Sequence, residues 1–168
     1  MTNPEARASL VDVAHQWAFW LLFRLALMRW RFSKPSCRGS LVMLWRSDQV
    51  LLVRTSYTPG WHAPGGGIEP GERPIEAALR ELREEIGLIL EESDLRLALT
   101  TEYEWNFRQD RAFIFEAEMP TNQAIKLDLR EIIEARMVPL ETARQFQMPP
   151  HILEYLSMVN SARDRRQS

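Results

Sequence analysis

The spacing of hydrophobic positions changes several times along this chain, and each change marks an expected element. Residues 39–46 (GSLVMLWR) and 49–55 (QVLLVRT) are rich in apolar and β-branched residues, and they flank the turn pair Ser47-Asp48. This pattern predicts a β-hairpin. Residues 56–67 carry proline or glycine at each break and predict a loop. Further strands are predicted at residues 95–105, 111–118 and 135–140.

Two helices are predicted after this loop. Residues 74–86 have apolar positions at helical spacing; Pro74 suits the first helical position and Gly87 suits the left-handed position after a helix. A final helix is expected to follow the proline pair at 149–150 and to end near Ala162. Because strands and helices mix without strict alternation, the expected fold class is α/β, an α/β/α sandwich around a mixed β-sheet.

The N-terminal part does not fit this scheme. Residues 1–13 are expected to be frayed or weakly helical, whereas residues 14–32 predict a helix that is apolar nearly all round. Its densest part, residues 14–28, would span about 22 Å as a helix, against a hydrocarbon core of about 30 Å. The expected organisation is therefore an N-terminal apolar helical extension (1–37), one domain (38–162) and a flexible basic tail (163–168).

Three environments are open for residues 14–32: a second subunit, a membrane interface, or an exposed patch prone to aggregation. Tryptophans and the basic residues Arg24, Arg29 and Arg31 would suit contact with anionic headgroups. However, a helix that lies in a membrane interface should have a polar face, which this segment lacks. We therefore expect a homodimer, with peripheral membrane contact through residues 14–32 as the alternative.

Composition narrows the class of protein. The 168 residues are 45% hydrophobic and 26% charged, which is ordinary for one globular domain. The net charge of −2 gives no electrostatic reason to expect a nucleic-acid partner. The single cysteine, Cys37, excludes an internal disulfide framework and favours a reducing compartment. The expected location is cytoplasmic, with membrane association left open by the N-terminal helix.

The helix at 74–86 has an unusual acidic face. At about 100° per residue, Glu84 and Glu85 lie about 60° and 40° on either side of Glu81, beside an apolar stripe. Like charges at this spacing repel. A solvated acidic face, with Glu84 paired to Arg80, would explain the helix alone. The preceding glycines favour a second interpretation, a site for a metal ion and a phosphate. Hard divalent cations bind carboxylates together with substrate phosphates, and a glycine loop can bring a backbone carbonyl close to the same ion.

This stretch resembles the Nudix box of the Nudix hydrolase family. The box requires a glycine, five residues, a glutamate, seven residues, and then Arg-Glu-apolar-x-Glu-Glu-x-Gly-apolar. Gly66, Glu72 and residues 80–88 (RELREEIGL) fill all nine defined positions. A chance match at nine fixed positions is improbable. The resemblance extends more weakly over about residues 38–145 and does not obviously cover residues 1–37.

The resemblance implies a metal-dependent site. Family members use Mg²⁺ or Mn²⁺ to cleave a nucleoside diphosphate linked to another moiety. By resemblance, Glu84, Glu85 and the carbonyl of Gly65 would be metal ligands, and Glu81 would be a further ligand or the general base. Arg80 would orient these carboxylates through ion pairs.

Two further roles follow from the same resemblance. Glu72 would stabilise the junction between the loop and the helix. A further acidic ligand is expected from outside the box, with Glu131 as first choice and Glu134 as second.

The substrate is less well defined by the sequence. Tyr103 stands where ADP-ribose-cleaving relatives often carry a proline, and residues 104–106 lack the tyrosine of dinucleoside-polyphosphate relatives. A nucleotide-type small molecule is the expected partner. Packing would also explain Trp61 and Tyr103, and His62 is left open as a phosphate contact. The candidate substrate-binding residues are Gly66, Gly67, Glu72, Trp61 and Tyr103.

The sequence thus predicts a divalent-metal-dependent hydrolase in which water attacks phosphorus in a pyrophosphate bond. The alternative is a catalytically silent nucleotide-sensing module on the same scaffold. A module that no longer catalyses would be expected to have lost the carboxylates of the box first, and all of them are present in this chain. The enzyme is therefore the favoured interpretation.

Overall fold

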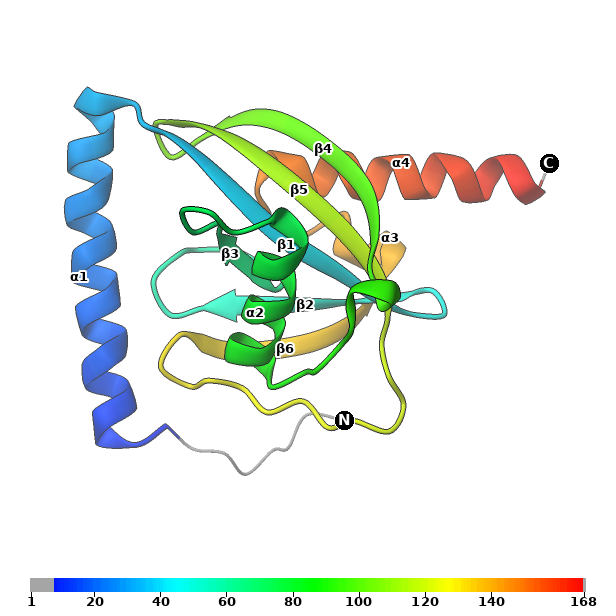
Figure 1. The fold of residues 1–168 in the computed structure, drawn as a ribbon, viewed down its shortest axis with the longest axis horizontal. Coiled ribbons are helices and arrows are strands. Elements are labelled where there is room, and N and C mark those ends of the chain that lie inside the picture. The colour runs from blue at the N-terminus through cyan, green and yellow to red at the C-terminus, as the bar shows by residue number, and fades with distance from the viewer. Residues whose placement is uncertain (1–7, 168) are drawn as a thin grey trace.

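The computed structural model describes the backbone of residues 8–167 and the side chains up to residue 162 (Figure 1). The predictions for residues 1–7 lie outside the described part. The elements, in chain order, are α1 (Leu10–Ser33), β1 (Ser36–Arg46), β2 (Gln49–Thr55), β3 (Gly65–Gly67), α2 (Pro74–Ile86), η1 (Glu92–Asp94), β4 (Arg96–Trp105), β5 (Arg108–Glu118), β6 (Ile132–Pro139), α3 (Leu140–Ala143) and α4 (Pro150–Gln167).

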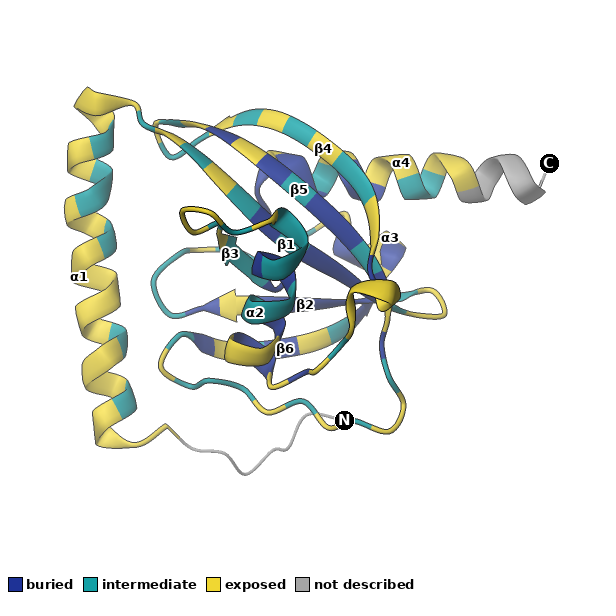
Figure 2. Ribbon diagram, viewed as in Figure 1, coloured by how far each residue is buried: buried dark blue, intermediate teal, exposed yellow. Residues whose placement is uncertain are grey.

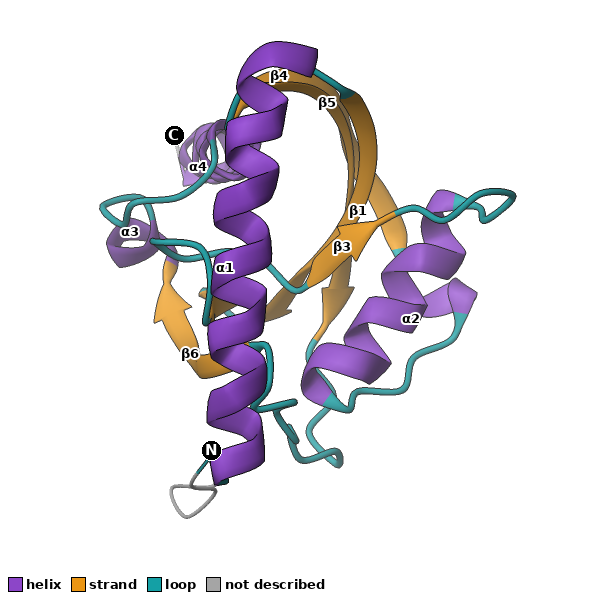
Figure 3. Ribbon diagram, turned by 90° about the vertical axis from the view of Figure 1, so that its left-hand side faces the viewer, coloured by secondary structure: helices purple, strands orange, loops and turns teal. Residues whose placement is uncertain are grey.

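The strands form one mixed sheet in the order β4-β5-β1-β2-β6, with β3 paired to β1. The pairing of β1 with β5 is parallel, and the other pairs are antiparallel. Figure 3 shows α2 on one side of the sheet and α3 and α4 on the other. The predicted α/β fold with a mixed sheet is confirmed.

The hairpin of β1 and β2 opens toward the glycine segment. The two strands pair only next to the turn, at Trp45 with Val50 and Arg46 with Gln49. Farther from the turn, β3 pairs with residues 39–41 of β1, and His62 forms a bridge with Val53 of β2. The expected loop therefore ends in a short strand, which inserts the glycines between two strands of the sheet.

Alternating side chains of β1 and β2 supply two separate cores. Val42 and Leu44 pack toward α2, whereas Met43 points to the opposite core, beneath α4. The first core includes Ala78, Leu82 and Ile86 of α2; the second includes Ile152, Tyr155 and Leu156 of α4. Two-sided burial fixes the register of the strands, because a slip by one residue would exchange the two cores.

Most predicted elements appear near their expected positions. The bounds of β2 and α2 agree with the prediction, and α2 ends at Gly87 with φ of 67°. The expected helix at 14–32 begins earlier, at Leu10, because Ser9 and Asp12 form a capping box. Backbone helix also extends to Gln167, beyond the end expected near Ala162 and into the predicted tail.

Helix α1 lies beside the rest of the fold and runs across one end of the strands (Figure 1). None of its residues is buried, and Figure 2 shows its outer face as almost entirely exposed. It touches the domain through one stripe: the Gln16 amide donates to the Leu129 carbonyl at 2.6 Å, and Phe19 and Phe23 contact the Tyr57 ring. Among the described helices it alone has the length and mean hydropathy (1.2) that would suit a membrane span.

Candidate active site

The glycine segment presses its backbone against two carboxylates of α2. The Gly65 N–H donates to the Glu85 carboxylate at 2.9 Å. A Cβ on Gly65, which has φ of 149°, would lie 2.3 Å from the Ser40 carbonyl oxygen. A Cβ on Gly66 would lie 2.3 Å from the Glu81 carboxylate. At Gly65 only glycine fits, because the close atoms are backbone, whereas a side chain at Gly66 would displace the Glu81 carboxylate from its present position.

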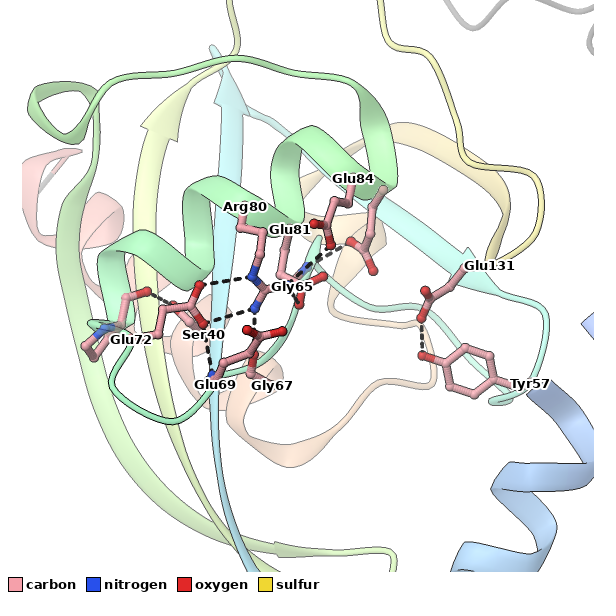
Figure 4. Close-up of polar contacts among 12 residues, drawn as sticks. Ser40, Tyr57, Gly65, Gly67, Glu69, Glu72, Arg80, Glu81, Glu84 and Glu131 are labelled. Atoms are coloured by element: carbon pink, nitrogen blue, oxygen red, sulfur yellow. Dashed lines mark hydrogen bonds and ion pairs between the residues drawn. The ribbon is translucent and has the colours of Figure 1, made fainter. Parts of the chain in front are cut away.

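Arg80 joins the loop to the acidic face (Figure 4). It donates to Glu72 at 3.0 and 3.1 Å, to Glu81 at 2.7 Å and to Glu84 at 3.3 Å. It also donates to the Gly67 carbonyl at 2.9 Å. Glu72, whose pKa is lowered mainly by this hydrogen bond to Arg80, also accepts from the backbone N–H of Glu69. The contacts are those that the orienting role of Arg80 and the junction role of Glu72 require.

The acidic cluster carries unfavourable electrostatic energy. Glu85 is only 5% exposed, and burial raises its pKa well above the ordinary value. The charges of Glu131, Glu81 and Glu84 raise that pKa further, while the hydrogen bond from Gly65 opposes the rise. The pKa of Glu81 is raised by burial, although the hydrogen bond to Arg80 lowers it. A cation placed among these carboxylates would relieve both the desolvation and the repulsion.

Glu131 and Glu134 have different surroundings. Glu131 accepts a hydrogen bond from the Tyr57 hydroxyl, and its charge acts on both Glu81 and Glu85. Glu134 is paired with Arg54 at 3.1 Å and with Arg136 at 2.6 Å. The structure therefore favours Glu131 as the acidic residue beside the box (Figure 4).

The donor set suits a hard divalent cation. The candidate ligands are all oxygen atoms, and the coupling of Glu85 to three other carboxylates shows where positive charge is needed. In the described part of the chain, no three histidine, cysteine, aspartate or glutamate side chains form a ready group for a metal ion. Glu81 and Glu84 bond to Arg80 instead, so metal binding requires these contacts to be exchanged.

A cavity of about 350 Å³ begins at this cluster. One end is lined by Glu85 and the glycines of β3, and the other end by the β4–β5 hairpin. The hairpin register places Tyr103 opposite Asp110 and Trp105 opposite Arg108. The cavity volume is within the range of about 300–1,000 Å³ that is typical of small-molecule sites.

The hairpin turns through Asn106 and Phe107, which both have positive φ, at 52° and 65°. These angles are typical of the tight two-residue turn that closes a β-hairpin. The sequence prediction missed this turn and therefore missed two polar residues of the cavity, Arg108 and Asp110. Asp110 is 3% exposed, pairs with Arg108 and accepts from the backbone N–H of Cys37 at 3.2 Å.

Two histidines line the cavity in the uncharged form. Burial lowers the pKa of His62 to about 4 and that of His151 to about 3. Near neutral pH both side chains are therefore neutral, so a contact of His62 with phosphate would be a hydrogen bond from the ring N–H rather than an ion pair. Tyr103 lines the same cavity and lies against His151, with ring centroids 4.0 Å apart.

Trp61 lies outside the lining of the cavity. Its ring stacks on Phe146, with centroids 5.3 Å apart, and the guanidinium groups of Arg54 and Arg136 lie over it at 5.8 and 5.6 Å. Packing, the alternative explanation, accounts for these contacts, and a contact of Trp61 with substrate stays a prediction.

Sequence reasoning also missed cavity residues that lie far from the box. The alternation of residues 103 to 110 could have suggested Arg108 and Asp110 once a hairpin turn at Asn106 was recognised. No local pattern could have placed Tyr57 beside Glu131, because the contact joins residues separated by 74 positions. Phe23, Trp30 and His151 are further cavity residues that the sequence prediction did not identify as part of the site.

Comparison with known proteins agrees with this geometry. Residues 35–158 match the family model described as NUDIX domain. A putative 8-oxo-dGTP diphosphatase from Bacillus subtilis (strain 168) is 47% identical over 47 residues, which are 28% of this chain and 32% of that protein. The human diphosphoinositol polyphosphate phosphohydrolase 3-alpha is 54% identical over 44 residues, which are 26% of this chain and 27% of that protein. The chain thus spans about a third or less of the length of these relatives.

The fold has close counterparts among solved structures. The crystal structure of the MutT protein from Methanosarcina mazei Go1 superposes with a TM-score of 0.67. The match covers 79% of this chain and 98% of that one, at 22% sequence identity. At this level of identity the likeness establishes the fold, whereas substrate and metal must be argued from the site.

Proposed function

The chain belongs to the NUDIX family, and from this premise we propose that it is a divalent-metal-dependent pyrophosphohydrolase. Its substrate would be a nucleoside diphosphate linked to another moiety, which includes nucleoside triphosphates. Water would attack phosphorus and break the pyrophosphate bond. The two relatives act on different compounds by their names, so they support cleavage of phosphate anhydrides and leave the leaving group open.

One observation carries the proposal. Glu81, Glu84 and Glu85 lie together on α2, next to a glycine segment whose backbone is held against them and beside a cavity large enough for a small molecule. A structural helix gains nothing from this arrangement, since the burial and mutual repulsion of the carboxylates cost stability. A site for a cation and a phosphate would explain the cost.

The residues of the site would have different catalytic roles. Glu84, Glu85, Glu131 and the carbonyl of Gly65 would hold Mg²⁺ or Mn²⁺. When bound, such an ion neutralises phosphate charge and makes coordinated water more acidic. Glu81 would either accept the proton of the attacking water or bind a further ion, and a pH–rate profile of Glu81→Gln would separate these roles.

The remaining residues would position these groups. Arg80 would keep the carboxylates oriented, since it already bonds to two of them and to Glu72. Gly66 and Gly67 would leave room for phosphate beside Glu81.

The test is release of phosphate or pyrophosphate from a panel of nucleotides by purified protein, with Mg²⁺ and with Mn²⁺. Hydrolysis that disappears on chelation of the metal would support the proposal. Tight nucleotide binding without turnover, under all metal conditions, would instead identify the chain as a catalytically silent nucleotide-sensing module.

We further propose that the exposed face of α1 contacts a second copy of the chain. Large apolar side chains on this face are substantially exposed, including Trp17 at 67% and Leu22 at 61%. Exposed apolar area of this kind is typical of interfaces. Contact with a membrane surface through residues 14–32 is the alternative. The low cysteine content is consistent with a cytoplasmic location, free or membrane-associated.

A further inference from the structure

Helix α1 reaches the same cavity as the box. Phe23 and Trp30, both on the inner stripe of α1, line the cavity together with Glu85 and the glycines of β3. These two positions are seven residues apart, about two helical turns, so they face the same side of α1. The N-terminal helix therefore forms one wall of the cavity as well as presenting an outer face to solvent.

Contacts link this wall to both ends of the cavity. The ring of Phe23 lies 5.6 Å from that of Tyr57, whose hydroxyl donates to Glu131. Trp30 lies beneath the guanidinium of Arg108, which is 4.4 Å from the ring centroid and is paired with Asp110. Helix α1 is thus in contact with the carboxylate end through Phe23 and with the hairpin end through Trp30.

Two buried polar atoms of the cavity residues have no partner. Among the described residues, the Nε of Arg108 and the Nδ1 of His151 make no hydrogen bond and are inaccessible to solvent. His151 as a whole is only 4% exposed. A buried polar atom left unsatisfied costs about 1–3 kcal/mol. Because both atoms are closed to solvent, a polar ligand at this end of the cavity would satisfy them only after a small shift of the side chains that cover them.

We propose that α1 completes the substrate site by providing Phe23 and Trp30 as the wall against which an aromatic ring of the substrate, its nucleobase, is held. Tyr103 and Trp105 line the same end of the cavity. The polar edge of the base lies toward Arg108 and His151, which line this end of the cavity, and the phosphates extend toward the glycines and Glu85. This proposal rests on the proposed function and adds a residue-level account of substrate selection, with the N-terminal helix as a determinant of specificity.

The helix provides matched controls for the test. Trp30 lines the cavity, whereas Trp17 is 67% exposed; Phe23 lines the cavity, whereas Phe32 is 87% exposed. Each pair carries the same residue type on one helix and differs in the face on which it lies. The four alanine variants are compared in the full-length protein, and thermal melting confirms that each is folded.

Two measurements are made on each variant. The first is kcat and KM for the best nucleoside triphosphate of the panel and for inorganic triphosphate, which has no base. The second is the Kd of a non-hydrolysable nucleoside triphosphate analogue. Stacking of a base on an aromatic side chain contributes about 1–3 kcal/mol. We therefore expect Trp30→Ala to raise KM and Kd for nucleotides about 5- to 150-fold, because each 1.4 kcal/mol corresponds to a tenfold change.

The controls define the outcomes. Trp17→Ala and Phe32→Ala should leave these constants unchanged, Trp30→Phe should restore most of the affinity, and values for inorganic triphosphate should not change in any variant. Equal nucleotide constants for Trp30→Ala and Trp17→Ala would overturn the inference, as would a preference of the parent for an alkyl diphosphate over every nucleotide. Nucleotide binding that depends on Trp30 without any hydrolysis would overturn the proposed function and support the inference.

Discussion

The two ends of the cavity are built in opposite ways. The carboxylate end comes almost entirely from one continuous segment, residues 65–88, in which α2, its cap and the glycine strand are adjacent in the chain. The hairpin end, called the aromatic end below because Trp30, Tyr103 and Trp105 line it, is assembled from α1, the β4–β5 hairpin and α4. These elements are separated by up to about 120 positions in the chain. Local spacing can encode the first end, whereas only the tertiary fold brings the second together.

The residues at the two ends of the cavity are also constrained in different ways. At the carboxylate end, positions are constrained by charge or by backbone space, as with Gly65, where a Cβ would lie 2.3 Å from the Ser40 carbonyl oxygen. At the aromatic end, rings contact rings and many replacements could preserve the packing. Under the proposed function, the reaction would depend on the first end and the choice of substrate on the second.

The largest expected effect is at the carboxylate end. Glu85→Gln should lower kcat by at least about 100-fold, because losing a general base or a metal contact typically costs two or more orders of magnitude. The fold should survive, since the amide keeps the size of a 5%-exposed side chain and can still accept the Gly65 hydrogen bond at its carbonyl oxygen. Steady-state hydrolysis and thermal melting are the measurements.

The control for this prediction is Glu118→Gln, an exposed glutamate at the end of β5. It should keep the parental rate. Activity of Glu85→Gln within threefold of the parent would contradict the assignment of the site. Glu81→Gln is expected to behave like Glu85→Gln.

A second prediction concerns metal binding at the same end. Mg²⁺ or Mn²⁺ should raise the melting temperature, because an ion bound only to the native state adds stability by mass action, about 2.7 kcal/mol at 100 times its Kd. The shift should shrink in Glu84→Gln, and differential scanning fluorimetry with a titration of metal would measure it. An unchanged shift in that variant would place the ion elsewhere on the protein.

Much of the fold follows from local pattern. The bounds of α2 are set by Pro74 and Gly87, and its acidic face by helical spacing, so the sequence predicted both. Alternation predicted the strands but could not reveal that β1 and β2 diverge, because that opening depends on the insertion of β3. The same limit applies at Trp61, since its ring stacks on Phe146, which is distant in the sequence.

The third prediction tests the aromatic end through pH. The pKa of His151 is about 3, below the ordinary value of 6.5, so the unfolded chain binds the proton more readily. The stability provided by neutral His151 is fully present above pH 6.5 and is lost as the pH falls toward 3. For one such group the slope reaches about 1.4 kcal/mol per pH unit.

Replacement of His151 by Gln should flatten the decline in stability between pH 6.5 and 4.5. His62, with a pKa of about 4, will contribute to the dependence of the free energy of unfolding on pH in both proteins. Urea denaturation at several pH values provides the free energy of unfolding, and His15→Gln, on the exposed surface of α1, is the matched control. Parallel pH dependences for His151→Gln and the parent would show that His151 is not buried in the neutral form.

The smallest expected change, a twofold difference in mass, concerns the outer face of α1. Deleting residues 1–32 is predicted to convert a dimer to a monomer. The structure sharpens this test, because deletion also removes a wall of the cavity, whereas the double variant Leu21→Glu/Leu25→Glu changes only side chains that are 54% and 47% exposed. That variant should be monomeric and should retain the parental KM.

Light scattering and sedimentation would measure the mass. A full-length monomer that floats with anionic liposomes would contradict the dimer and favour the membrane, since charges introduced at Leu21 and Leu25 would then abolish flotation.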